Sequence, residues 1–129
     1  MLQHIKKLLE HNALYIAIAI TTFIAYLSLS SESKIDLGFT FKSKDKLYHT
    51  LAYFTLTFAW LFAFRNKYQN NKFKILTLCA LTFYGIILEV LQGTLTNYRT
   101  SDLYDAIANF LGVILGIFAF NIFLKWYNQ

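Results

Sequence analysis

The sequence contains no proline and only one cysteine among its 129 residues. Because proline removes a backbone donor and clashes with the preceding turn, its absence means that no helix is kinked by proline. The single cysteine, Cys79, excludes a disulfide within the chain. Since Cys79 lies in an apolar run, we expect it to be a small buried side chain.

Charged residues are also scarce and make up 15% of the chain. A soluble domain carries about 25%. Hydrophobic residues reach 57% and occur in blocks rather than in alternation, which is typical of a membrane protein. The net charge is +5, but the basic residues lie between the apolar blocks, where loops meet anionic lipid headgroups. With no zinc-finger or RNA-binding motif in the sequence, no nucleic-acid partner is predicted.

Four apolar segments divide the chain, at residues 13–29, 47–64, 75–95 and 103–127. A helix of about 20 residues, with a range of about 17–25, crosses the hydrocarbon core of a bilayer. Strands are disfavoured because no segment alternates strictly and lone strands leave backbone groups unsatisfied in lipid. The sequence therefore predicts an all-α fold, a polytopic membrane four-helix bundle that forms a single domain over residues 1–129.

The first apolar segment resembles a secretory signal, with Lys6 and Lys7 before it. Its apolar core is longer than the about 7–15 residues of a signal, so we expect a retained helix. Basic residues are slightly more frequent on the side of the two termini, and such residues favour the cytoplasmic side. We predict a multi-pass protein of a cell membrane, with both termini in the cytoplasm and the loops at 31–46 and 96–102 outside.

Polar residues gather where this topology brings three segments together at the outer face. Residues three or four apart share one side of a helix, as Asp45, His49 and Tyr53 do. Gly112 and Gly116 form a GxxxG pattern, which permits close approach of a neighbouring helix. These glycines continue a stripe of acidic residues, so the acids should face inward. The predicted ligand-binding residues are Asp45, Lys46, His49, Tyr53, Gln92, Arg99, Asp102, Asp105 and Asn109.

Glu89 is the most demanding of the polar residues because it lies inside the third apolar segment. A charge at mid-membrane costs roughly 2.5–3.5 kcal/mol, so Glu89 must be protonated, paired or hydrated. Its candidate partners are Arg99, His49 and Lys46.

Structural roles are an alternative for several of these residues. Asp102 and Asp105 stand at the start of a helix, where the positive end of the helix stabilises acids. Thr100 or Ser101 would then be the N-cap. Gln92 would be hydrogen-bonding glue between helices.

Three stretches of the chain resemble the VanZ-like family of small bacterial membrane proteins. They are DKLYHTLAYFTL at 45–56, LEVLQ at 88–92 and YRTSDLYDAIANFLGVILG at 98–116. The resemblance implies a polytopic protein of the bacterial cell envelope, located in the plasma membrane. The family's named member is associated with low-level resistance to teicoplanin, a lipid-bearing glycopeptide, so the resemblance also suggests glycopeptide tolerance.

Two functions remain open on the sequence alone, and the first is binding. The second and fourth helices would point their positive N-terminal ends outward, which suits an anion. Lys46 and Arg99 would add charge-assisted hydrogen bonds to a phosphate. The ligand would be an anionic lipid, a cell-wall precursor or a lipoglycopeptide.

The second open function is an intramembrane enzyme acting on a lipid-linked substrate. Glu89 or Asp105 would be the general base and His49 its acid or base partner. The same residues with Asp102 could hold a divalent metal. However, the sequence has no H-E-x-x-H, no cysteine pair and no G-x-S-x-G. We therefore predict no metal and no cofactor. Transport is a weaker alternative, since four short helices would need an oligomer to form a path.

Overall fold

The computed structural model describes residues 1–30, 38, 43–98 and 100–129. These residues form four α-helices and one short 3-10 helix, η1, and none of them forms a strand. The elements in chain order are α1 (Leu2–Leu29), α2 (Lys44–Ala63), η1 (Arg65–Lys67), α3 (Asn71–Leu95) and α4 (Leu103–Tyr127). The prediction of an all-α four-helix bundle is confirmed.

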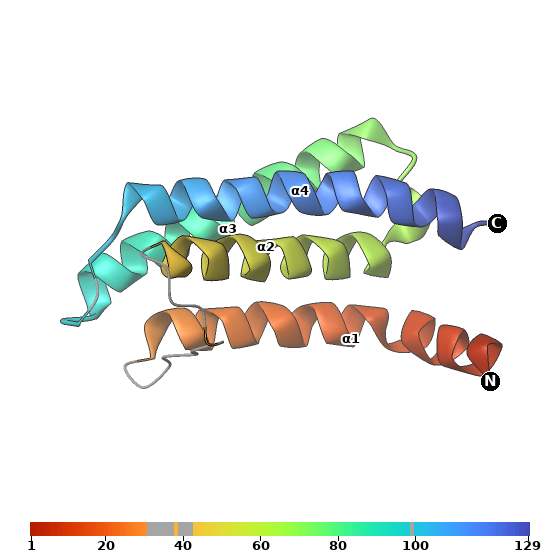
Figure 1. The fold of residues 1–129 in the computed structure, drawn as a ribbon, viewed down its shortest axis with the longest axis horizontal. Helices are drawn as coiled ribbons and strands as arrows, with labels where there is room; N and C mark the ends of the chain where they lie inside the picture. Colours follow the sequence, from red (N-terminus) through yellow and green to blue (C-terminus); the bar gives the residue numbers. More distant parts are fainter. Residues whose placement is uncertain (31–37, 39–42, 99) are drawn as a thin grey trace.

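The helices lie along one another, and both termini are at the same end of the bundle (Figure 1). In this view α2 lies between α1 and α4, while α3 crosses behind α4 at an angle. The starts of α2 and α4 and the last turns of α3 meet at the end opposite the termini. This arrangement gives the bundle two distinct ends, which we call the terminal end and the far end.

The helix ends differ from the predicted bounds where polar residues extend a helix beyond its apolar segment. The first helix begins at Leu2 rather than at residue 13, and the third begins at Asn71 rather than at 75. The side chain of Asn70 caps α3 by accepting a hydrogen bond of 2.9 Å from the backbone N–H of Lys72. Hydropathy marks the part of a helix that suits the hydrocarbon core, whereas capping residues mark where the helix ends.

Three of the helices in the described part of the chain are long and apolar enough to cross a membrane, namely α1, α3 and α4. We predicted four spans, and α2 does not meet this standard although it has 20 residues. The reason is composition, since α2 contains Lys44, Asp45 and Lys46 in its first turn and further polar residues after them. Its place between α1 and α4 means that neighbouring helices cover much of its surface (Figure 1).

The closest helix contact joins α2 and α4 through two glycines. A Cβ atom added to Gly112 would collide with the backbone carbonyl oxygen of Thr50. One added to Gly116 would lie 2.8 Å from the Cβ of Thr57, which is fully buried. The expectation that this GxxxG pattern serves close helix packing therefore agrees with the geometry.

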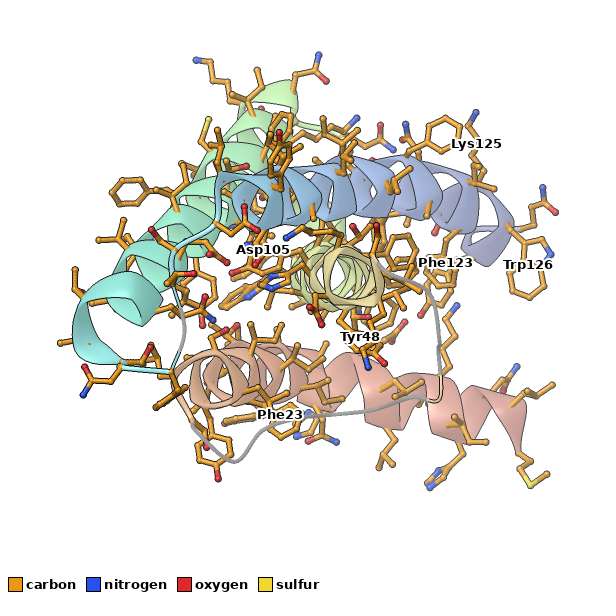
Figure 2. The ribbon with its side chains drawn as sticks, turned by 60° about the vertical axis from the view of Figure 1, so that its left-hand side comes forward. Phe23, Tyr48, Asp105, Phe123, Lys125 and Trp126 are labelled. Atoms are coloured by element: carbon orange, nitrogen blue, oxygen red, sulfur yellow. The ribbon has the colours of Figure 1, made fainter. Side chains whose placement is uncertain are left out.

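Two apolar clusters fill the interior. The central one contains Ile24, Tyr53, Leu56, Leu81, Leu88 and Val113, and the one toward the terminal end contains Leu61, Tyr68, Phe120 and Leu124. Side chains at the C-terminal end of α4 also face outward, as Lys125 and Trp126 do in Figure 2. The expectation of a buried Cys79 is wrong, because its side chain is exposed. In a membrane helix an apolar run faces lipid as well as the core, so it does not predict burial.

Candidate functional site

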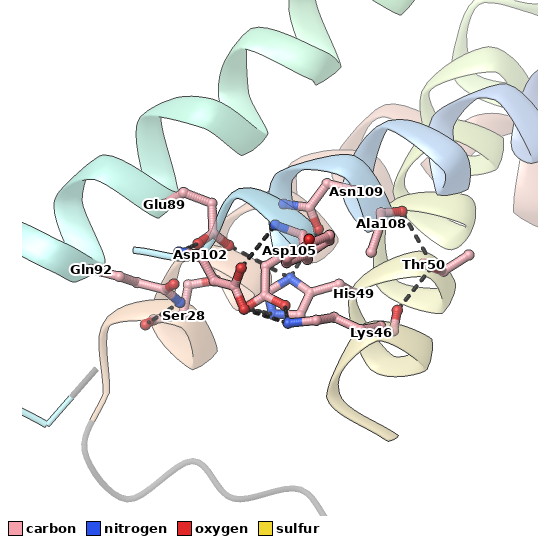
Figure 3. A network of polar contacts seen from close by, with 11 residues as sticks. Ser28, Lys46, His49, Thr50, Glu89, Gln92, Asp102, Asp105, Ala108 and Asn109 are labelled. Atoms are coloured by element: carbon pink, nitrogen blue, oxygen red, sulfur yellow. Dashed lines mark hydrogen bonds and ion pairs between the residues drawn. The ribbon is translucent and has the colours of Figure 1, made fainter. Parts of the chain in front are cut away.

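Six polar side chains from three helices converge at the far end of the bundle (Figure 3). We call this group the polar site, and it comprises Lys46, His49, Glu89, Asp102, Asp105 and Asn109. The starts of α2 and α4 supply five of these side chains, and α3 supplies Glu89 near its end. The close packing of α2 on α4 at Gly112 brings these two helices near enough for the contacts to form.

Lys46 fastens α2 to the start of α4. Its Nζ lies 2.6 Å from Oδ2 of Asp102 and also donates to Oδ1 of Asp105. The other oxygen of Asp102 accepts a hydrogen bond of 2.8 Å from the backbone N–H of Tyr104, which makes Asp102 the N-cap of α4. The N-cap is therefore one residue beyond Ser101, the nearer of our two expected positions. The hydrogen bond from Lys46 holds the pKa of the Asp102 carboxyl below its ordinary value.

His49 lies between acceptors on both sides. Its Nδ1 is 2.9 Å from Oδ1 of Asn109, and its Nε2 is 3.5 Å from Oδ2 of Asp105. If Nδ1 donates to the Asn109 oxygen, a neutral imidazole presents its lone pair at Nε2 to the Asp105 carboxylate. The imidazole is therefore held between an amide oxygen on one side and a carboxylate oxygen on the other.

Glu89 forms the floor of the polar site. Its Oε2 accepts from the backbone N–H of Asp102 at 3.4 Å, and its Oε1 lies 3.8 Å from Nδ1 of His49. Side-chain exposure falls from 38% at Asp102 through 16% at Asp105 to 7% at Glu89. The site thus runs from an open rim to a buried carboxylate.

The other predicted residues lie around this site or apart from it. The Gln92 side chain is buried and donates to the backbone oxygen of Ser28 at 2.9 Å, which ties α3 to α1. Asp45 is exposed, and Arg99 lies outside the described residues. Tyr53 is buried, and its hydroxyl has no hydrogen-bond partner in the part of the chain that the structure describes.

Thr50 is a contributor that sequence reasoning missed. Its hydroxyl lies 2.9 Å from the backbone oxygen of Lys46 and 3.2 Å from that of Ala108, so it bridges α2 and α4 beneath the polar site. Its place four residues after Lys46 was a usable signal. The role of Ser28 was not foreseeable, because a backbone oxygen has no signature in the sequence.

Three of these residues could together hold a cation. His49, Glu89 and Asp105 each offer one ligand atom, and these atoms lie within 4.8 Å of one another. Imidazole and carboxylate groups suit a divalent metal. The ammonium of Lys46 offsets only part of the negative charge there, because the polar site also holds the carboxylates of Asp102, Asp105 and Glu89. The arrangement can therefore attract a cationic group or move a proton between His49 and a carboxylate.

Comparisons with known proteins identify the family of the chain. Residues 5–124 match the family model described as VanZ/LLP1. The chain is also 32% identical over 111 residues to the "Uncharacterized protein C11E3.10" of Schizosaccharomyces pombe. That alignment covers 84% of this chain and 62% of the yeast protein, so the chain spans less than two thirds of its relative. No solved structure matches the chain. Because the family model covers nearly the whole sequence, the chain belongs to the VanZ/LLP1 family of membrane proteins.

Proposed function

We propose that this membrane protein binds the charged headgroup of a lipid or lipid-linked molecule in the polar site. The supporting observation is the graded exposure, from Asp102 at the rim to the buried Glu89. Ionisable groups are costly in a membrane and persist mainly where they line a pathway or a site. A headgroup at the membrane surface would reach the rim, while its attached chains would stay in the hydrocarbon.

The charges of the polar site indicate which headgroup fits best. Glu89, Asp102 and Asp105 provide three carboxylates, against the one ammonium of Lys46 and the imidazole of His49. A purely anionic group would therefore be repelled by these residues. A headgroup with both an ammonium and a phosphate fits better, with its ammonium near Glu89 and its phosphate near Lys46. This refines the expectation of an anionic ligand.

The proposal also includes the type of membrane and the side of it on which the polar site lies. We propose that both termini are cytoplasmic, which places the polar site at the outer face of the membrane. In a bacterium this would be the plasma membrane, where a cell-wall precursor or a lipoglycopeptide is also available. The yeast relative favours a ligand common to both kinds of organism, namely a phospholipid. Tolerance of teicoplanin would then be a secondary effect of altered lipid at the cell surface.

A second candidate function is an intramembrane enzyme with acid–base chemistry. It is favoured by the position of His49, whose Nε2 is 3.5 Å from Asp105 and whose Nδ1 is 3.8 Å from Glu89. One of the carboxylates would take a proton from a hydroxyl or water, and His49 would pass a proton to the leaving group. The substrate would be the same lipid headgroup that the binding proposal invokes.

One experiment separates binding from catalysis. The purified chain is placed in nanodiscs with phosphatidylethanolamine and phosphatidylglycerol of identical acyl chains. Retained lipids are counted by native mass spectrometry, and lipid products are followed by liquid chromatography. We expect retention of phosphatidylethanolamine that is lost in Glu89→Gln and kept in Lys125→Gln, which removes an exposed charge at the terminal end.

Each result has a clear meaning for the proposal. Lipid products that form with wild type and disappear in Glu89→Gln would establish the enzyme instead. Absence of bound phosphatidylethanolamine from wild type, or phosphatidylethanolamine retention unchanged in Glu89→Gln, would contradict headgroup binding at the polar site. Teicoplanin susceptibility of a bacterial host that expresses either form tests the secondary effect separately.

A further inference from the structure

A second polar cluster lies at the terminal end of the bundle. The hydroxyl of Tyr127, on α4, donates to Oε1 of Glu10 on α1. Nη2 of Arg65, in η1, lies 3.7 Å from the same oxygen. Nζ of Lys6 sits 4.0 Å from the centre of the Tyr127 ring. These contacts join α1 to the last turn of α4 at the terminal end of the bundle.

A polar cavity of about 400 Å³ opens between these residues. Lys6 and Arg65 bring two positive charges to its wall, and Glu10 brings one negative charge. Glu10 is already engaged by Tyr127 and Arg65. Among the described residues no carboxylate lies within ion-pair distance of Lys6. The cavity therefore keeps a surplus of one positive charge and suits an anion.

An apolar groove of about 470 Å³ runs along the bundle between α1 and α2. Leu9 and Ala13 line it from α1, Phe58 and Phe62 from α2, and Phe123 from α4. Figure 2 shows Phe123 on the side of α4 that faces α1, whereas Lys125 points away.

The polar cavity and the apolar groove adjoin one another. Leu9 of the groove is next to Glu10 of the cavity. Phe62 of the groove has its ring 5.8 Å from that of Tyr127 and 5.1 Å from the guanidinium of Arg65, both in the cavity wall. Together they form an amphipathic site, charged at the terminal end and apolar along the span.

We propose that this amphipathic site binds one phospholipid with an anionic headgroup. The phosphate lies against Lys6 and Arg65, and one acyl chain occupies the groove past Phe62. Basic pockets between membrane helices recognise anionic headgroups in this way. A soluble anion would leave the groove unfilled, and a helix of another protein would leave the cations unpaired. The proposal is independent of the function proposed for the polar site, which lies at the opposite end.

The test uses the full chain in nanodiscs that contain equal amounts of phosphatidylglycerol and phosphatidylcholine with the same acyl chains. After extraction into detergent, native mass spectrometry counts the lipids that remain bound. One surplus basic charge near a membrane surface predicts about fivefold enrichment of phosphatidylglycerol. We expect Lys6→Gln with Arg65→Gln to abolish the enrichment. The matched control, Lys72→Gln with Lys125→Gln, removes two exposed charges outside the cavity and should preserve it.

A second variant tests the groove. Ala59→Phe fills the apolar lining and should lower retention of both lipids while circular dichroism shows unchanged helicity. If the double basic variant does not fold, Lys6→Gln alone decides the question. Because Lys6 forms no ion pair among the described residues, this variant should fold and should lower the enrichment of phosphatidylglycerol.

Several results would overturn the lipid site. They are the absence of bound phosphatidylglycerol from wild type, unchanged phosphatidylglycerol retention in the basic variant, and unchanged retention in Ala59→Phe. Displacement of the lipid by millimolar inorganic phosphate would identify a free anion as the occupant instead. Glu89→Gln should not alter the number of phosphatidylglycerol molecules retained, so failure here and failure of the polar-site proposal can be told apart.

Discussion

The two ends of the bundle each hold a carboxylate within a largely apolar chain, but they neutralise it differently. At the terminal end Glu10 accepts from Tyr127 and lies 3.7 Å from Arg65, so partners outnumber the acid. At the far end Glu89 has an imidazole nitrogen at 3.8 Å and one backbone N–H at 3.4 Å. Asp102 and Asp105 compete there for the single ammonium of Lys46.

We interpret this difference as a difference in role between the two clusters. A cluster selected for stability alone would give each buried acid its own cation or donor. The terminal end comes close to that, and it clasps α1 onto α4. The far end keeps surplus acids around His49, which costs stability and is the usual mark of a functional site. Four changes test this comparison, from the largest expected effect to the smallest.

The largest effect should come from the glycine seam that supports the far end. In Gly112→Ala the new Cβ meets the backbone oxygen of Thr50, and a backbone atom cannot move aside without separating α2 from α4. We expect a loss of about 3 kcal/mol in unfolding free energy, at the upper end for overpacking. Titration with sodium dodecyl sulfate, followed by circular dichroism, measures it. Leu115→Ala, at an exposed site on the same helix, is the control. A Gly112→Ala protein as stable as wild type would refute a close-packed seam.

The next effect concerns the one ammonium of the polar site. Lys46→Met leaves Asp102 and Asp105 without their shared cation, next to Glu89. We expect a loss of about 1 kcal/mol, since charged hydrogen bonds are strong but this pair is partly exposed. Lys44→Met, two residues earlier, is the control and should change little. Adding Asp102→Asn to Lys46→Met should recover part of the lost unfolding free energy. A double variant less stable than Lys46→Met alone would argue against a surplus of acids at the far end.

The same isosteric change should affect thermal stability differently at the two ends. Glu89→Gln removes a charge from the acid-rich end and should leave thermal stability unchanged or raised. Glu10→Gln weakens the contacts with Tyr127 and Arg65 and should lower it slightly. Both melting temperatures are measured in the same detergent. If Glu89→Gln were the more destabilising of the two, the far end would be the better-satisfied cluster and our comparison would be reversed.

The smallest effect is a dependence on pH. The hydrogen bond from Lys46 depresses the folded-state pKa of Asp102. A depressed carboxyl pKa adds stability above the unfolded pKa of about 3.9 that is lost as pH falls through the folded value. Wild type should therefore lose more stability than Asp102→Asn between neutral pH and pH of about 3. Melting curves across this range decide it, and parallel curves for the two proteins would mean that the Lys46 contact is not maintained.

The fold was largely predictable, because apolar segment lengths and the absence of strand-like alternation indicate membrane helices. The helix ends were less so, since α1 extends to Leu2 and Asp102 itself caps α4. We also counted α2 as a membrane span from its apolar residues, although its length and composition do not meet the standard for one. Several of its polar residues are covered by neighbouring helices, and a sequence pattern does not show this.

The candidate site was predictable in membership more than in pairing. Helical spacing and topology bring His49, Glu89 and Asp105 to one end, and the structure does place them together. Spacing cannot reveal that Lys46 is engaged by two aspartates, because that depends on the distance between helices. The contact between Glu10 and Tyr127 joins residues at opposite ends of the chain and belongs to no motif. Whether these residues bind or catalyse stays a prediction.

The modest apolarity of α2 has a consequence for how the protein is made. Chains are synthesised from the N-terminus, so α2 leaves the ribosome well before α4, its close partner at Gly112 and Gly116. Among the helices of the described residues, α2 is the one that length and composition do not mark as a candidate span. Its packing against α4 can form only late, once the C-terminal helix has been made. The charged contacts of the polar site would thus form only after translation is nearly complete, since Lys46 of α2 needs Asp102 and Asp105 at the start of α4.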